Sequence, residues 1–234
     1  MMKRASNSFF GHLQQLQATL IKVILTILCG FIASFFFHKE ILFWLTKPIV
    51  PELILLSPFE GFLTACKIAF ISGVLLTSPL SIYFILLFLL PALHSRERKL
   101  ILLLLILSFL FVLGGACFGY FITLPLSLDF LENFSLGINL WSLTKTVSFI
   151  LSLLFAHALA FEAVVISLFF THIGLFHYDW LIKARRFVYV ALFIAAAILT
   201  PPDVVSQLLL ALPLIILFEL ITLYAFFKKK QVLS

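Results

Sequence analysis

The sequence predicts an all-α integral membrane protein, and its composition and the length of its apolar runs carry that prediction. Of the 234 residues, 63% are hydrophobic and only 11% are charged, and the mean hydropathy is +1.22. A soluble domain is nearer half apolar and a quarter charged, so a soluble fold could not bury this much apolar surface. The apolar residues form long continuous runs, whereas a transmembrane β-barrel shows short segments of alternating hydrophobicity.

Six runs are expected to cross the bilayer, since a helix spans the hydrocarbon core with about 20 apolar residues. Pro125 is expected to end the third run. The first run lacks a small-residue cleavage site and is too long for the core of a signal peptide, so we expect it to be retained. Without an evident repeat or linker, residues 1–234 are expected to form one transmembrane domain. The expected spans are about residues 20–37, 66–90, 99–125, 147–171, 187–200 and 203–227.

The distribution of lysine and arginine predicts the orientation of these spans. The two termini and the loops after the second and fourth spans together hold eleven of these residues, not counting Lys22 at the start of the first span. The opposite face holds four, which are Lys39, Lys47, Lys67 and Lys145. Because basic loops stay in the cytoplasm, both termini are expected to be cytoplasmic, in a multi-pass protein of the cytoplasmic (inner) membrane.

The fifth and sixth helices are expected to be short. The fifth run holds 13 residues before Thr200, which is about 20 Å of helix against a hydrocarbon core of about 30 Å. Such a helix must thin the bilayer or lie beside a hydrated cavity.

Two segments on the outer face have the pattern of a helix start with proline in the first turn. The first is SPFE, with Ser57, Pro58 and Glu60, and the second is TPPD at 200–203. In each, a hydroxyl residue can cap the helix and the acidic residue can reach back to the cap. We expect Ser57, Pro58 and Glu60, together with Pro48, to be structural. The rigid pair Pro201–Pro202 between two short spans also suggests a docking surface.

Two acidic residues are candidates for a binding function. Glu97 lies in the first turn of the third helix, after Ser95 as the expected cap, where it is either a solvated carboxylate or a site for a cationic peptide. Glu162 lies in the middle of the fourth span, where a charge costs about 2.5–3.5 kcal/mol. It should therefore face a hydrated cavity or a polar partner. Three roles stay open for it: lining a polar cavity, hydrogen bonding within the bundle, or carrying a proton. His157 is expected to be a packed or interfacial histidine.

Five segments occur in order along the six spans: SPFEGF, FLLPALHSRERKL, FVLGGACFGYFITLPL, AFE and ILTPPDVVSQLLLALPLIILFE. Together they resemble the TatC family, the multispanning core of the twin-arginine protein translocase, from about Gly11 to Phe227. The resemblance implies a six-helix cup with a partly hydrated concave face. It also implies a receptor for the twin-arginine signal peptides of folded cargo proteins, with export driven by the proton-motive force. The implied partners are TatA- and TatB-like single-span proteins, within a complex that contains more than one copy of this chain.

The resemblance also implies roles for particular residues. Glu97 matches the family's acidic contact to the twin arginines, Phe88 matches a position used near that site, and Glu162 matches a glutamate on the concave face. The face formed by the fifth and sixth spans is expected to receive a partner's transmembrane helix, with Gln207 as the polar contact. Glu219 is expected to be solvated or paired with the C-terminal lysines. The residues expected on the partner-helix face are Thr200, Pro201, Pro202, Asp203 and Gln207.

The N-terminal segment departs from the family pattern His-Leu-x-Glu-Leu-Arg. Here GHLQQLQATL places Gln15, Leu16 and Gln17 where the family has Glu, Leu and Arg. A glutamine can accept a hydrogen bond from arginine but brings no charge, and a charged hydrogen bond is roughly twice as strong as a neutral one. Recognition then depends more on Glu97, or the peptide preference is relaxed, or this member is impaired.

The sequence does not suggest an enzyme. It has no GxxxxGK[ST] loop for ATP, no Ser–His or paired-aspartate arrangement of an intramembrane protease, and no spacing typical of a metal site. Cys29, Cys66 and Cys117 lie inside apolar runs and are expected to be packing residues. No cofactor and no nucleic acid is expected to bind. The alternative function is a small proton-coupled transporter that uses Glu162, although such transporters usually show inverted repeats.

Overall fold

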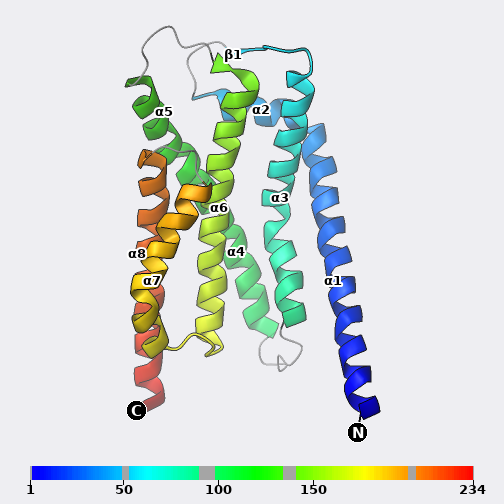
Figure 1. Ribbon diagram of the computed structural model, residues 1–234, viewed down its shortest axis with the longest axis vertical. Helices are drawn as coiled ribbons and strands as arrows, with labels where there is room; N and C mark the ends of the chain where they lie inside the picture. The colour runs from blue at the N-terminus through cyan, green and yellow to red at the C-terminus, as the bar shows by residue number, and fades with distance from the viewer. Residues whose placement is uncertain (1, 49–52, 90–97, 134–140, 200–203, 234) are drawn as a thin grey trace.

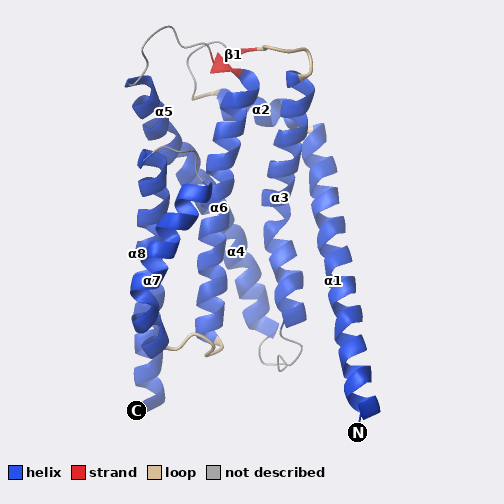
Figure 2. Ribbon diagram, viewed as in Figure 1, coloured by secondary structure: helices blue, strands red, loops and turns tan. Residues whose placement is uncertain are grey.

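The protein is a bundle of long helices with two very short strands at one end (Figures 1 and 2). The computed structural model describes residues 2–48, 53–89, 98–133, 141–199 and 204–233. The helices are α1 (Met2–Phe36), α2 (His38–Thr46), α3 (Glu60–Leu89), α4 (Arg98–Phe118), α5 (Leu124–Asn133), α6 (Leu143–His172), α7 (Tyr178–Leu199) and α8 (Val204–Leu233), with a π-helical turn η2 (Gly119–Thr123) between α4 and α5. The parallel strands β1 (Leu53–Ile54) and β2 (Trp141–Ser142) pair Leu53 with Trp141 and Ile54 with Ser142.

Five segments of the described chain are long and apolar enough to cross a membrane. They are Gln14–Phe36, Glu60–Phe88, Leu103–Asn133, Leu143–His172 and Val204–Lys230. The helix α7 corresponds to the expected fifth span. Its early turns carry Lys183, Arg185 and Arg186, and only a short apolar stretch follows them. The start of α1 and the end of α8 lie at the same end of the bundle (Figure 1), as an even number of membrane crossings requires.

Two predictions about helix ends are wrong. Pro125 does not end the third span, because η2 leads directly into α5 and the helical path continues to Asn133. The Leu124 N–H bonds to the Gly119 carbonyl five residues back, and this wider turn places Pro125 in the first turn of α5, where a missing N–H is tolerated. The helix α8 is also not short, since it has 30 residues. It begins well below the β1 end of α6, and its length carries it past the opposite end of that helix (Figure 1).

The sequence did not reveal α2 or the β1–β2 pair, both of which lie at the end of the bundle away from the chain termini (Figure 1). The helix α2 is held there by the Tyr120 hydroxyl, which donates to the Trp44 carbonyl at 2.5 Å. Leu45 of α2 is buried in the same apolar cluster as Ile68 of α3 and Ile150 of α6. This end of the molecule is therefore closed by segments that are too short to span a membrane.

The helix α6 is the most buried of the spans and α1 is the least. It packs against α3, α4 and α8, whereas α1 packs mainly along α3 at the edge of the bundle (Figure 1). Proline inside α3 is tolerated because the Ser78 hydroxyl donates to the Leu75 carbonyl at 3.0 Å. In a regular helix the Leu75 carbonyl would accept a hydrogen bond from the N–H of residue 79, but Pro79 has no N–H to donate.

Glycine allows two pairs of helices to approach until their backbones touch. A Cβ atom built on Gly73 of α3 would lie 2.6 Å from the backbone nitrogen of Phe31 in α1. One built on Gly115 of α4 would lie 2.6 Å from the carbonyl oxygen of His157 in α6. Small residues at such crossings are typical of membrane helices, where close van der Waals packing drives association.

Candidate functional site

Glu162 is buried between helices and does not face lipid. Its side chain is 1% exposed, and the Ser108 hydroxyl of α4 donates to its Oε1 atom. The other carboxylate oxygen, Oε2, is buried and has no hydrogen-bond partner among the described residues. A polar partner on a neighbouring helix is one of the environments expected for this residue. The contact with Ser108 joins α4 to α6.

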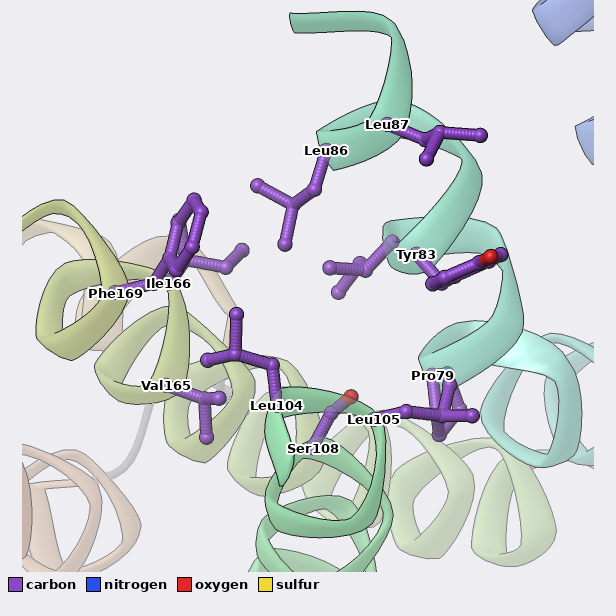
Figure 3. A pocket seen from close by; sticks show the side chains of 11 residues that line it. Pro79, Tyr83, Leu86, Leu87, Leu104, Leu105, Ser108, Val165, Ile166 and Phe169 are labelled. Atoms are coloured by element: carbon purple, nitrogen blue, oxygen red, sulfur yellow. The ribbon is translucent and has the colours of Figure 1, made fainter. Parts of the chain in front are cut away.

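A mainly apolar cavity lies beside this pair, between α3, α4 and α6 (Figure 3). Pro79 and Tyr83 line it on α3, Leu104 and Ser108 on α4, and Phe169 on α6. Its volume of about 40 Å³ is sufficient for a few water molecules, because one water needs about 10–15 Å³ on this scale. Glu162 does not line the cavity, and Ser108 is the residue that both borders the cavity and contacts the carboxylate. The expectation that Glu162 itself lines a polar cavity stays a prediction.

Replacing Ser108 with alanine is expected to lower the free energy of unfolding by about 1–2 kcal/mol, since it leaves a buried carboxyl without its partner. Ser108→Thr keeps the hydroxyl and is the matched control, and Glu162→Gln should be tolerated because an amide oxygen can accept the same bond. The midpoint of unfolding of the purified protein in detergent measures the effect. Equal midpoints for the alanine and threonine variants would show that the bond contributes nothing.

His157 is a packed histidine, as expected, and it joins three parts of the bundle. The ring is fully buried, its Nδ1 atom lies 2.9 Å from the Leu153 carbonyl, and its Nε2 atom lies 3.0 Å from the Thr123 hydroxyl in η2. It is also within hydrogen-bonding reach of the Leu209 carbonyl in α8. That carbonyl lies four residues before Pro213 and so lacks a normal helical partner. The spacing from Leu209 to Pro213 is the sequence signal that an extra donor is needed.

The hairpin of α7 and α8 is held together by polar contacts along its length. Arg185 Nη2 lies 2.6 Å from Glu219 Oε2, and the Tyr189 hydroxyl donates to Glu219 Oε1. Glu219 therefore pairs with an arginine on the adjacent helix rather than with the C-terminal lysines, and its side chain remains about one-third exposed, at 35%. Gln207 donates from Nε2 to the Phe193 carbonyl at 3.2 Å, so part of its hydrogen-bonding capacity joins α8 to α7. Its expected role in contacting a partner helix stays a prediction.

Of the residues expected to bind a signal peptide, those that the structure describes lie toward the end of the bundle that holds both termini. Gln15, Leu16 and Gln17 are all exposed on α1. Phe88 is partly buried near the end of α3, which runs beside α1 (Figure 1). The Lys22 ammonium of α1 lies 5.9 Å from the centre of the Phe84 ring of α3, and so connects the two helices close to these residues. Glu97 lies outside the described residues.

The segment SPFE forms a turn before α3 rather than the expected capping box. The Glu60 N–H bonds to the Ser57 carbonyl at 3.1 Å, which makes Pro58 the second residue of a turn, a position that proline favours. The Glu60 carboxylate does reach back, but it accepts from the Leu56 N–H at 2.7 Å. Pro48 is partly buried in the turn after α2. Thr200, Pro201, Pro202 and Asp203 lie outside the described residues.

The remaining candidate groups do not form a reactive site in the described part of the chain. Its His, Cys, Asp and Glu residues form no group of three that could hold a metal ion. Cys29, Cys66 and Cys117 are free thiols. The contacts of Ser108 with Glu162 and of Arg185 with Glu219 each join one helix to another. The fold and these contacts define a polytopic helical membrane protein whose inner polar groups organise the bundle.

The chain belongs to the TatC family. The family model described as Sec-independent protein translocase protein (TatC) matches residues 11–213. A TatC protein of Helicobacter pylori strain J99 is 36% identical over 217 residues, which is 92% of this chain and 87% of that protein. The TatCy protein of Bacillus subtilis strain 168 is 32% identical over 225 residues, covering 94% of this chain and 89% of the relative.

Solved structures agree with this assignment. A crystal structure of the twin-arginine translocase receptor TatC is 34% identical, with a TM-score of 0.79 over 92% of this chain and 97% of that one. A second crystal structure, of the same receptor in the detergent DDM, has a TM-score of 0.82 over 92% and 99% of the two chains. The predicted six-helix, cup-like membrane fold is thereby confirmed. These comparisons support a translocase component, which is not an enzyme, over the alternative of a proton-coupled transporter.

Proposed function

We propose that this protein is the receptor subunit of a twin-arginine translocase, which binds twin-arginine signal peptides and takes part in the export of folded proteins driven by the proton-motive force. The observation that carries the proposal is the match to the crystallised receptor, with a TM-score of 0.82 at 34% identity over nearly the whole of both chains. This identity and coverage support the same role for this chain.

The signal peptide is proposed to bind at the end of the bundle where α1 begins and α3 ends. Glu97 would accept hydrogen bonds from the arginine pair, since a carboxylate matches the bidentate geometry of guanidinium. Phe88 would contribute apolar contact. The exposure of Gln15, Leu16 and Gln17 on α1 supports this placement, because side chains that are not used in packing are free to contact a peptide.

The single-span partners, of the TatA and TatB type, are proposed to pack on the face formed by α7 and α8. Thr200, Pro201, Pro202, Asp203 and Gln207 are the candidate contacts. Supporting this choice, Val190, Ile194 and Ile198 of α7 are large apolar residues that are exposed along one face of the helix. The assembled complex is proposed to hold more than one copy of this chain, with no nucleic acid.

The protein is proposed to lie in the cytoplasmic (inner) membrane with both termini in the cytoplasm. Lysine and arginine are concentrated at the end of the bundle where α1 begins and α8 ends, which is the distribution expected of a cytoplasmic face. The whole chain is proposed to act as a single transmembrane domain.

Complementation tests the proposed function directly. A bacterial strain that lacks its own TatC is expected to recover export of a reporter fused to a twin-arginine signal peptide when it expresses this chain together with the cognate single-span subunits. A reporter with two lysines in place of the arginines is the control and should be exported poorly. Failure to export either reporter, with the protein present in the membrane in normal amounts, would contradict the proposal.

Restoring the family residues on α1 is expected to strengthen signal-peptide binding. The double substitution Gln15→Glu and Gln17→Arg adds a carboxylate at an exposed position, and a charge-assisted hydrogen bond contributes about 1.5–3 kcal/mol. The dissociation constant of a labelled signal peptide should fall by about tenfold or more. Gln14→Glu, one residue away on the same exposed helix, is the matched control. No gain from the double substitution beyond that of the control would mean that the site has compensated elsewhere.

A further inference from the structure

A second pocket lies at the end of the bundle that holds the termini, between the α6–α7 turn and the last turns of α8. Its volume is about 350 Å³, several times that of the cavity beside Ser108. The residues that give it its chemistry are Phe176, His177, Tyr178, Asp179, Lys228 and Lys229. None of them belongs to the surfaces proposed above for the signal peptide or the partner helix.

The pocket lies at the depth where a membrane meets water. The span in α6 ends at His172 and the span in α8 ends at Lys230, so the pocket borders the ends of two membrane helices. Aromatic rings surround it: Phe176 stacks on Trp180 at 4.9 Å between ring centres, and Tyr178 packs against Phe226 at 5.3 Å. Tryptophan and tyrosine are enriched at the level of the lipid headgroups.

Two lysines are held in fixed positions at the pocket wall. Lys228 Nζ donates to the Thr171 carbonyl at 3.2 Å and to the His172 carbonyl. Lys229 Nζ contacts both carboxylate oxygens of Asp179, at 2.8 and 2.7 Å. An ammonium group has three donors, so Lys228 keeps one hydrogen for a further acceptor. These contacts orient the positive charges before any ligand arrives.

The charge at this site is positive overall. Asp179 is the one acidic residue among the described residues that line the pocket. Its hydrogen bonds to Lys229, together with the charge of that lysine, hold its pKa below the usual range, although desolvation opposes this shift. Lys183, Arg186 and Lys230 are exposed nearby on the same two helices. Arg185 is occupied by Glu219. The pocket is thus suited to an anion.

We propose that this pocket binds the phosphate group of an anionic phospholipid, with Lys228 and Lys229 as its principal contacts. Basic pockets between membrane helices at headgroup depth bind anionic lipids. The acyl chains have an apolar surface at the edge of the pocket. Leu175 is exposed between the lining residues Gly174 and Phe176, and the half-exposed Trp180 stacks on Phe176. This inference depends on the membrane location of the protein and is independent of signal-peptide binding.

Trp180 provides a reporter of lipid binding at this pocket. It is half-exposed and stacked on Phe176, whereas Trp44 and Trp141 lie in α2 and β2 at the other end of the bundle. The full chain with Trp44→Phe and Trp141→Phe would be reconstituted in phosphatidylcholine nanodiscs. A small, equal fraction of brominated phosphatidylglycerol or brominated phosphatidylcholine is then added. Stronger quenching by the anionic lipid is expected. Each lysine should raise the affinity for phosphatidylglycerol relative to phosphatidylcholine about fivefold.

Substitutions that remove a positive charge and a substitution that removes a negative charge together distinguish a loss of lipid binding from a loss of folding. Lys229→Gln should lower the ratio of the affinities for phosphatidylglycerol and phosphatidylcholine several-fold. The double variant Lys228→Gln and Lys229→Gln should bring this ratio close to one. Asp179→Asn should raise it, because it removes the competing carboxylate and releases Lys229. Lys230→Gln is the matched control, since that lysine carries the same charge but does not line the pocket. A structural role alone would lower the affinity in both the lysine and the aspartate variants.

Inorganic phosphate distinguishes a lipid headgroup from a free anion. Phosphate added at constant ionic strength should leave the quenching by brominated phosphatidylglycerol nearly unchanged if the acyl chains contribute to binding. Displacement of the lipid by millimolar phosphate would overturn the assignment to a phospholipid. Equal quenching by the two brominated lipids, or a loss in Lys230→Gln as large as in Lys229→Gln, would also overturn it.

Discussion

Replacing Gly115 with alanine is expected to destabilise the protein by about 1–3 kcal/mol, the range typical of overpacking a close contact. The added Cβ atom would lie 2.6 Å from the His157 carbonyl oxygen, 2.9 Å from its carbon and 3.0 Å from Ala158 Cα. All three are backbone atoms of α6, so neither helix can relieve the clash by moving a side chain. The helices α4 and α6 must separate, which would also weaken the bond between Ser108 and Glu162.

Gly114→Ala is the matched control for this prediction. Gly114 is adjacent in the same helix, and a Cβ atom built on it meets nothing within 4 Å. Since alanine favours a helix over glycine by about 1 kcal/mol, this variant should be as stable as the parent or more stable. The unfolding midpoint in detergent, followed by tryptophan fluorescence, compares the two. Equal midpoints for the variants would show that the α4–α6 crossing is looser than the structure indicates.

Replacing Glu97 with alanine is expected to weaken signal-peptide binding by about 10- to 100-fold and to abolish most export. The proposal places this carboxylate against the arginine pair, and a hydrogen bond to a charged group contributes about 1.5–3 kcal/mol. The loss should be severe in this protein because Gln15 and Gln17 bring no second negative charge. The affinity of a fluorescently labelled signal peptide for the purified protein measures it.

Two comparisons isolate the charge of Glu97 from its size. Glu97→Gln keeps an acceptor of the same shape and should have an intermediate affinity. A peptide with two lysines should bind the parent protein more weakly than the arginine peptide, because lysine lacks the bidentate geometry, and Glu97→Ala should lose this preference. If the alanine variant bound both peptides as the parent does, Glu97 would not be part of the site.

Hydropathy predicted six membrane helices, and each expected span overlaps a long helix of the structure. The apolar runs are longer than a soluble core needs, and in lipid a backbone satisfies its hydrogen bonds by forming a helix. The same reasoning anticipated the short apolar stretch of α7. It also placed Glu162 beside either a hydrated cavity or a polar partner, since an isolated carboxyl in lipid is too costly, and the structure shows a polar partner, Ser108. The departure at Gln15 and Gln17 was likewise visible from the order of residues.

Several features depended on contacts between residues far apart in the chain. Pro125 was expected to end a helix, but the π-helical turn before it removes the need for its N–H. Glu219 pairs with Arg185, 34 residues earlier, because the α7–α8 hairpin brings them together. The short helix α2 packs on the bundle through the contact between Tyr120 and Trp44 and through the buried Leu45, which local sequence cannot reveal.

The sequence by itself determined the class of the protein, its number of membrane helices and the family to which it belongs, because transfer of apolar residues into lipid and the order of motifs are properties of single segments. The tertiary structure decided which polar groups meet: Ser108 with Glu162, His157 with Thr123 and the carbonyl before Pro213, and Lys229 with Asp179. These partners lie on different helices, and only the close packing at residues such as Gly115 determines how far apart and at what register the helices lie.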